Sequence, residues 1–178
     1  MFKGFRRKVG ISYSRLLFRQ HRDRVMDFTD ALAGSRRALI IYPESAPDGD
    51  GLASLVRYLS RKFSSEGMTV LVRDDQKSSL DFSPAVKTLT YSEKDINAWL
   101  VPRQKLLKRM KTKQFDVVLD LNRDLALPGA LLCKASEAPL RVSFEKQEAD
   151  RFYNFQVRTG EHDASRSYRS LQKCLEMF

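Results

Sequence analysis

The sequence has 178 residues, the length of one domain, and its 42% hydrophobic and 30% charged residues suffice for an ordinary core. Two cysteines and two histidines exclude a disulfide scaffold and a Cys/His zinc module. No apolar run approaches the roughly 20 residues that span a bilayer. With a net charge of +10, the sequence indicates a soluble, basic, single-domain protein, for which we expect no metal and no cofactor.

The positive charge is concentrated in two segments. Residues 1–37 hold ten Lys/Arg against three acids, and residues 103–113 hold six bases and no acid. Basic segments bind anionic lipid headgroups or nucleic-acid phosphates, so we expect an anionic partner of one of these two kinds. A solvated surface that keeps the protein soluble explains the charge equally well. The bases concerned are Arg6, Arg7, Lys8, Arg15, Arg19, Arg103, Lys105, Lys108, Arg109, Lys111 and Lys113.

The N-terminal region and the two cysteines both bear on the cellular compartment. Its arginines, with no acid before Asp23, resemble an organellar transit peptide, although a basic helix of the mature fold has the same composition. No apolar signal-peptide region is present. Cys133 and Cys174 fall among apolar neighbours on predicted helices, as buried thiols of a reducing compartment do. We therefore expect a cytoplasmic protein, with peripheral contact to the inner membrane as an open alternative.

The N-terminal 37 residues are predicted to form a basic helical segment ahead of the main domain. Tyr13, Leu16 and Leu17 begin a helical apolar pattern over residues 12–33, which Gly34 ends. We expect this helix to pack its apolar side on its own domain. For residues 1–11, packing, membrane binding and nucleic-acid binding stay open.

Residues 38–178 alternate between short apolar runs and amphipathic helices. This order favours a Rossmann-like, open, mostly parallel α/β sheet of about six strands with helices on both faces. The direction of the third strand stays open, because a connection of about ten residues is short for a parallel crossover. The strands are expected at 38–42, 69–72, 86–91, 115–121, 140–144 and 153–157. The helices are expected at 52–63, from Ser92 through Ile96 and Trp99, from Pro102, around Pro128 and from Ser165.

A ligand crevice is predicted where the first and fourth strands end, since open α/β sheets bind ligands beyond their carboxyl edge. A carboxylate there could act as a general base on a hydroxyl or hold Mg²⁺, but helix capping explains the same residue types without any ligand. The Gly49–Gly51 loop lacks the spacing of a phosphate-binding loop. The predicted crevice residues are Glu44, Asp48, Asp50, Asn122, Arg123 and Asp124.

Four segments resemble a family of small uncharacterised bacterial proteins known as a domain of unknown function. They are Met1–Gly4, Ile96–Trp99 ahead of Pro102, Phe115–Asn122 and Pro139–Val142. The resemblance covers nearly the whole chain. It implies a shared fold and a bacterial, cytoplasmic origin, and it implies no activity.

Residues 38–145 are more distantly similar to the N-terminal, acceptor-binding half of heptosyltransferase-like (GT-B) glycosyltransferases. The similarity lies in Gly49-Asp50 after the first strand and in Asp120-Leu121 at the end of a later one. It implies the role of catalytic base for Asp50, although Ala53 stands near the place of the family's histidine. A length of 178 residues leaves no room for the donor-binding half.

We therefore expect a non-catalytic, basic α/β binding or interaction module that resembles the acceptor half of such a transferase. A protein partner is also open. Two alternatives stand beside it. The first is a glycosyltransferase-like subunit whose donor domain comes from a partner chain, and the second is a nucleic-acid-binding protein that uses both basic segments.

Overall fold

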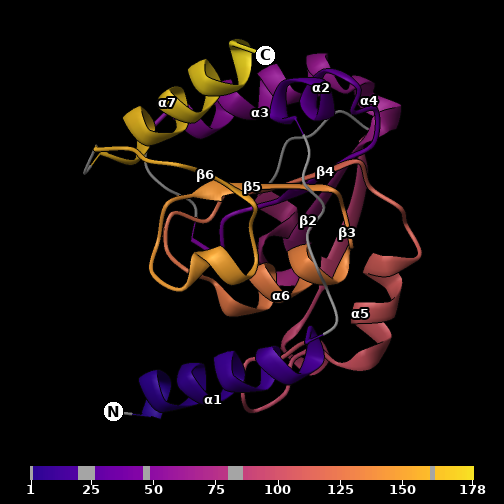
Figure 1. The fold of residues 1–178 in the computed structure, drawn as a ribbon, viewed down its shortest axis with the longest axis vertical. Helices are drawn as coiled ribbons and strands as arrows, with labels where there is room; N and C mark the ends of the chain where they lie inside the picture. The colour runs from indigo at the N-terminus through magenta and orange to yellow at the C-terminus, as the bar shows by residue number, and fades with distance from the viewer. Residues whose placement is uncertain (1, 20–26, 46–48, 80–85, 161–162) are drawn as a thin grey trace.

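The computed structural model describes residues 2–19, 27–45, 49–79, 86–160 and 163–178 (Figure 1). Six parallel strands form one open sheet in the order β3-β2-β1-β4-β5-β6, which confirms the predicted Rossmann-like α/β class. The strands are β1 (Ala38–Ile41), β2 (Met68–Arg73), β3 (Lys87–Tyr91), β4 (Val117–Asp120), β5 (Leu140–Phe144) and β6 (Phe155–Val157).

The central strands β1 and β4 are buried along their whole length, as expected of parallel strands covered on both faces. The direction of β3, which sequence reasoning left open, is parallel to β2. The connection between these two strands begins with a 3₁₀ helix, η1 (Asp74–Ser79). Its remaining residues, 80–85, lie outside the described part of the chain.

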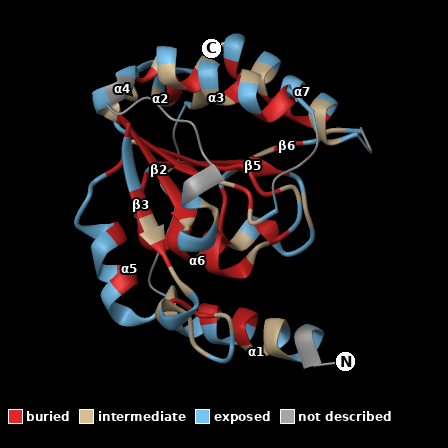
Figure 2. Cartoon of the chain, turned by 180° about the vertical axis from the view of Figure 1, so that it is seen from behind, coloured by how far each residue is buried: buried red, intermediate tan, exposed pale blue. Residues whose placement is uncertain are grey.

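Helices cover both faces of the sheet (Figures 1 and 2). Apolar side chains of α2, α3 and α7 pack on one face, and those of α1, α5 and α6 pack on the other. The helices are α1 (Phe2–Leu17), α2 (Phe28–Ala33), α3 (Gly51–Lys62), α4 (Ser64–Gly67), α5 (Gln104–Lys111), α6 (Leu127–Ala135) and α7 (Ala164–Glu176). Short 3₁₀ helices occur at η2 (Glu93–Asp95) and η3 (Ala149–Arg151).

Helix α6 is buried at every position, in contrast to the amphipathic helices around it (Figure 2). Pro128 lies in its first turn, as predicted, where a missing N–H has no consequence. Cys133 is fully buried near the end of this helix, and burial raises the pKa of its thiol well above the ordinary value. A thiol in this state is inert, which agrees with the prediction that it packs as a small hydrophobic side chain.

The prediction of one helix over residues 12–33 is wrong. Helix α1 already begins at Phe2, and a separate helix, α2, begins at Phe28. The Asp27 carboxylate accepts from the backbone N–H groups of Thr29 and Asp30, so it caps a new helix start inside the expected span. Residues 20–26 lie outside the described part.

Helix α1 packs on the domain through a different face from the one expected. Gly10 carries no side chain, and a Cβ there would collide with the Trp99 carbonyl and the Leu127 side chain. The two backbones therefore approach closely, which a bulkier residue would prevent. Of the residues that we expected to face inward, Leu17 packs against the core, whereas Tyr13 and Leu16 are exposed.

The short helix predicted through Ile96 and Trp99 is also wrong. Ser92 and Asp95 form a capping box, but it starts only the 3₁₀ turn η2. The chain then forms an antiparallel bridge between Ile96 and Pro102. The Asn97 side-chain oxygen accepts from the N–H groups of Trp99 and Val101, at 2.9 and 3.0 Å, which stabilises a turn in place of a helix.

Candidate functional site

A crevice lies at the carboxyl ends of β1 and β4, between which the strand order reverses as predicted. The loops that leave these two strands line a cavity of about 250 Å³. Four residues of the predicted crevice lie in its wall, together with Ser45 and Tyr168. These four are Glu44, Asn122, Arg123 and Asp124. Asp48 lies outside the described residues.

A larger cavity of about 530 Å³ shares Glu44 and residues 125–126 with the first. One of its walls is helix α1, and the others come from strand ends, the segment 92–100 and the approach to α6. Three guanidinium groups line it, those of Arg6 and Arg7 on α1 and that of Arg73 at the end of β2. Planar guanidinium groups match the geometry of phosphate and carboxylate, so these three could bind an anion beside the carboxylates of Glu44 and Glu93 in the same lining.

Glu44 is common to both cavities, and its backbone is fixed on both sides. Its N–H donates to the Asn122 side-chain oxygen at 2.8 Å, and its carbonyl accepts from the Gln76 side-chain amide at 2.6 Å. The Tyr91 hydroxyl donates to the Glu44 carboxylate at 3.4 Å. Residues that follow or end β4, β2 and β3 therefore set the position of this carboxylate.

The Glu44 side chain is partly removed from water. Burial raises the pKa of Glu44 above its ordinary value, and the positive charge of Arg73 opposes part of the rise. Arg73 itself forms an ion pair with Asp75 at 2.7 Å. A carboxyl group in this state can accept hydrogen bonds from ligand hydroxyls, and it can exchange a proton closer to neutral pH than an exposed one.

A buried polar network beneath the crevice fixes Asn122. The side-chain amide of Asn122 donates to Asp120 at 2.7 Å, and the Lys146 ammonium donates to the backbone carbonyl of Asn122 at 2.6 Å. Asp120 is fully buried, with Lys146 Nζ at 3.4 Å. The Tyr153 hydroxyl also donates to Asp120. Burial raises the pKa of Tyr153 well above its ordinary value, which keeps this hydroxyl protonated as a donor.

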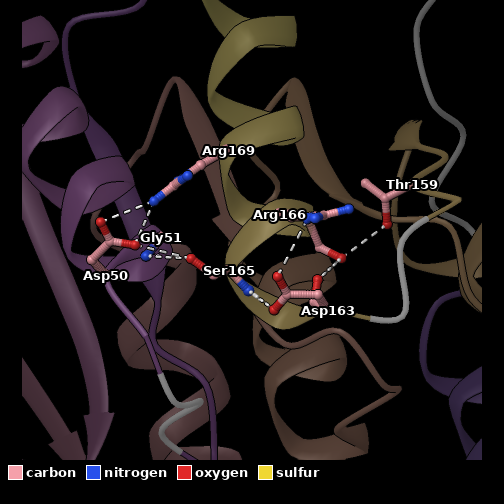
Figure 3. Close-up of polar contacts among 8 residues, drawn as sticks. Asp50, Gly51, Thr159, Asp163, Ser165, Arg166 and Arg169 are labelled. Atoms are coloured by element: carbon pink, nitrogen blue, oxygen red, sulfur yellow. Dashed lines mark hydrogen bonds and ion pairs between the residues drawn. The ribbon is translucent and has the colours of Figure 1, made fainter.

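Asp50 lies at the junction of α3 and α7, outside the walls of both cavities (Figure 3). Arg169 donates to both of its carboxylate oxygens, at 2.7 and 2.9 Å, and the Ser165 hydroxyl donates at 3.1 Å. These hydrogen bonds lower the pKa of Asp50, although the side chain is exposed. A carboxylate held in its ionised form by a guanidinium is a weak base.

The capping interpretation does not hold for Asp50 at α3, nor for Asn122 and Asp124 at α6. The other residue proposed to cap α3, Asp48, lies outside the described residues. Asp50 makes no side-chain cap bond to α3, and the N–H of Gly51 donates instead to the Ser165 hydroxyl at 3.0 Å (Figure 3). At α6 the cap position is Ala126, which has no capping side chain. Asn122 instead bonds within the crevice.

The predicted basic patch is divided by the fold. Arg6 and Arg7 are half-buried at the larger cavity, whereas Lys8 and Arg15 on α1 and Arg19 just after it are exposed. The bases of the second segment are exposed on or next to α5. They are Arg103, Lys105, Lys108, Arg109, Lys111 and Lys113, of which Lys111 pairs with Glu137 at 2.7 Å.

Sequence reasoning missed several residues of the site, among them Arg73, Tyr91 and Lys146. Arg73 directly follows the predicted strand 69–72 and Tyr91 ends the predicted strand 86–91, so the rule that placed Glu44 at the carboxyl edge would have found them too. Lys146 follows the predicted strand 140–144 at the same edge, but its pairing with Asp120, 26 residues away in the sequence, has no local signal. Among the residues that the structure describes, no group of three His, Cys, Asp or Glu side chains could hold a metal.

An open, parallel α/β sheet with a crevice at its switch point defines a Rossmann-like domain. The chain belongs to the family of unknown function DUF6913, which matches residues 27–178 and leaves α1 outside the match. No curated protein matches the sequence.

A solved structure with the same fold is that of the glycosyl transferase family 9 protein from Veillonella parvula DSM 2008. The TM-score is 0.56 at 13% sequence identity. The similarity covers 80% of this chain and 42% of that chain, so this protein spans less than half the length of the transferase. The distant similarity to a glycosyltransferase is thereby confirmed at the level of the fold.

Proposed function

We propose that the protein is a binding module whose crevice holds a small anion that carries hydroxyl groups, such as a sugar phosphate. The observation that carries the proposal is the position of Glu44, which lies between a cavity lined by three arginines and a second cavity at the switch point. The guanidinium groups would bind phosphate or carboxylate. Glu44 would accept hydrogen bonds from hydroxyl groups of the same ligand.

The buried network supports this assignment because it holds the crevice in place before a ligand arrives. Asn122 is fixed by Asp120 and Lys146, and it fixes the Glu44 backbone in turn. A prearranged site loses less conformational freedom on binding, which favours affinity. This polar chain reaches from the interior to the cavity wall.

The test is calorimetric titration of the full chain with glucose 6-phosphate, glucose and inorganic phosphate. We expect glucose 6-phosphate to bind most tightly, because it alone offers both hydroxyls and an anion. Arg7→Ala should weaken its binding at least about tenfold, since a charge-assisted hydrogen bond is lost. The control Lys108→Ala changes the same charge on α5 and should leave binding unchanged. The proposal would be overturned if Arg7→Ala and Lys108→Ala bound glucose 6-phosphate equally well, or if the wild-type protein bound none of the three probes.

A second function is favoured by the similarity to a family 9 glycosyltransferase over 42% of that chain. In that function the protein would be the acceptor half of a two-chain transferase, with the donor domain on a partner. Glu44 suits the role of base better than Asp50, because burial raises its pKa whereas Arg169 lowers that of Asp50. Asp50→Asn would test the base assigned from the family resemblance. Full activity of this variant, once a partner chain is found, would remove Asp50 from that role.

A further inference from the structure

The outer surface of α1 exposes a row of large hydrophobic side chains. Phe5 and Leu16 are 61% and 71% exposed, and their spacing of eleven residues places them on one face of the helix. Tyr13 lies beside them, and Trp99 meets the Phe5 ring edge-on with centroids 6.3 Å apart. Among the described residues, Met177 is the one other large hydrophobic side chain that is exposed. We call Phe5, Tyr13, Leu16 and Trp99 the α1 outer surface.

This exposure does not come from a helix that has failed to pack. The opposite face of α1 is docked on the domain, with Gly10 against the Trp99 carbonyl and Ile11 in the core. The Arg6 guanidinium also donates to the carbonyl of Ala98. Helix α1 thus lies along the body of the domain (Figures 1 and 2), and its apolar row is exposed.

The charged residues of α1 itself are all positive. Lys8 and Arg15 are exposed seven residues apart, two helical turns, on one side of the row, and Arg19 follows four residues later. The sequence of α1 contains no acidic residue. A helix with an apolar strip, an aromatic pair and flanking bases has the pattern of helices that lie in the plane of a membrane interface.

We propose that the α1 outer surface docks on a membrane rich in anionic lipids. Leu16 and Phe5 would enter the boundary between headgroups and acyl chains, with Trp99 at headgroup depth. Lys8, Arg15 and Arg19 would contact the lipid phosphates. The contact is peripheral, since no helix in the described ranges is long and apolar enough to cross a bilayer. The proposal does not depend on the crevice having a ligand.

Two other occupants fit the surface less well. A nucleic acid would use the bases, but its phosphate backbone offers nothing for the exposed aliphatic side chain of Leu16. A second copy of the chain packed through the same face would bring Lys8 and Arg15 of both copies together. Because α1 has no acid to pair with them, that arrangement is repelled.

The experiment uses the single tryptophan as a built-in probe. The full chain is titrated with vesicles of phosphatidylcholine mixed with phosphatidylglycerol, and with vesicles of phosphatidylcholine alone. We expect the Trp99 emission to shift to the blue with the anionic vesicles and to stay unchanged with the neutral ones. Cosedimentation should show the same selectivity, and added salt should weaken binding.

Two double variants locate the contact. Phe5→Ser with Leu16→Ser removes apolar contact, and Lys8→Gln with Arg15→Gln removes charge. Each should weaken vesicle binding more than about tenfold. The matched control, Lys108→Gln with Arg109→Gln on α5, removes the same charge and should change binding less than about twofold. Thermal unfolding checks that each variant folds. If one variant does not fold, the proposal is tested by whether the Trp99 emission of the wild-type protein shifts with anionic vesicles and not with neutral ones.

Several results would overturn the proposal. They are an absent or lipid-independent Trp99 shift, retention of binding by the apolar variant, and an equal loss in the α5 control. Binding to an oligonucleotide but not to vesicles would assign the bases to nucleic acid. Self-association that Leu16→Ser abolishes would assign the surface to a second copy. None of these results bears on the crevice, whose test uses soluble sugar and phosphate probes.

Discussion

Two regions of the molecule build polar clusters around an aspartate and a base. At the floor of the crevice, Asp120 is fully buried with Lys146 and Tyr153. At the junction of α3 and α7, Asp50 pairs with Arg169 at 2.7 Å, but its side chain is 75% exposed. Water screens the second pair and is absent from the first. Loss of one partner therefore costs little at the junction, whereas in the interior it leaves a buried charge without its counter-charge and costs a great deal.

The contrast extends to the two carboxylates that flank the loop between β1 and α3. Glu44 and Asp50 are six residues apart, yet burial raises the pKa of the first and the Arg169 contact lowers that of the second. Nothing in the local sequence separates them, since both lie in the segment between β1 and α3. The surroundings that tertiary folding supplies determine which of the two can exchange a proton closer to neutral pH.

Removing the buried aspartate should produce the largest effect. Asp120→Ala leaves the Lys146 ammonium without its buried counter-charge, and we expect a loss of about 3–5 kcal/mol in the free energy of unfolding. Urea denaturation measures it. Asp124→Ala, an exposed carboxylate in the same loop, is the control and should change stability by no more than about 0.5 kcal/mol. A loss of similar size in both variants would contradict a special role of the network.

Glu44 should give a smaller effect that depends on pH. Because its pKa is raised above the ordinary 4.5, the folded state holds the proton more tightly than the unfolded state. The stability that this provides is present below pH 4.5 and disappears as pH rises through the folded-state pKa. Glu44→Gln removes this dependence, so we expect the variant to gain stability relative to wild type as pH rises through that window.

Denaturation of both proteins across the acid range to neutral pH measures this difference. A constant offset between Glu44→Gln and wild type would mean that the carboxyl group titrates normally in the folded protein. If the stability of Glu44→Gln relative to wild type instead falls as pH rises, the charge of Arg73 has a larger effect on the pKa of Glu44 than burial has.

Asp50 should give the smallest effect. Asp50→Asn keeps the shape of the side chain and removes the charge of an exposed pair, so we expect little change in the midpoint of thermal unfolding at any salt concentration. Gly51→Ala is the informative neighbour, because a Cβ there would collide with the Ser165 backbone. We expect it to lower stability by about 1–3 kcal/mol. A larger effect of Asp50→Asn than of Gly51→Ala would show that charge, and not close packing, holds α3 to α7.

The sheet and the edge of the crevice were predictable because their signals are local. Apolar runs such as 38–41 and 117–120 are buried strands, and polar residues that directly follow them, such as Asn122, must reach the carboxyl edge. The Lys146–Asp120 pair was not predictable, because a lysine after a strand has the composition of ordinary surface. The docking face of α1 was predicted wrongly, since the apolar pattern favoured Tyr13 and Leu16 whereas Gly10 permits the closest approach.

Because α6 is fully buried, its thiol, Cys133, is far less accessible than the second native thiol, Cys174. Cys174 is half-buried on α7, so a thiol reagent reaches it through local fraying of the last helix, whereas Cys133 reacts only when the core opens. The ratio of the two labelling rates separates partial from global opening with no engineered probe. Any substitution at the crevice or at the helix junction can thus be assigned to the fluctuation it promotes.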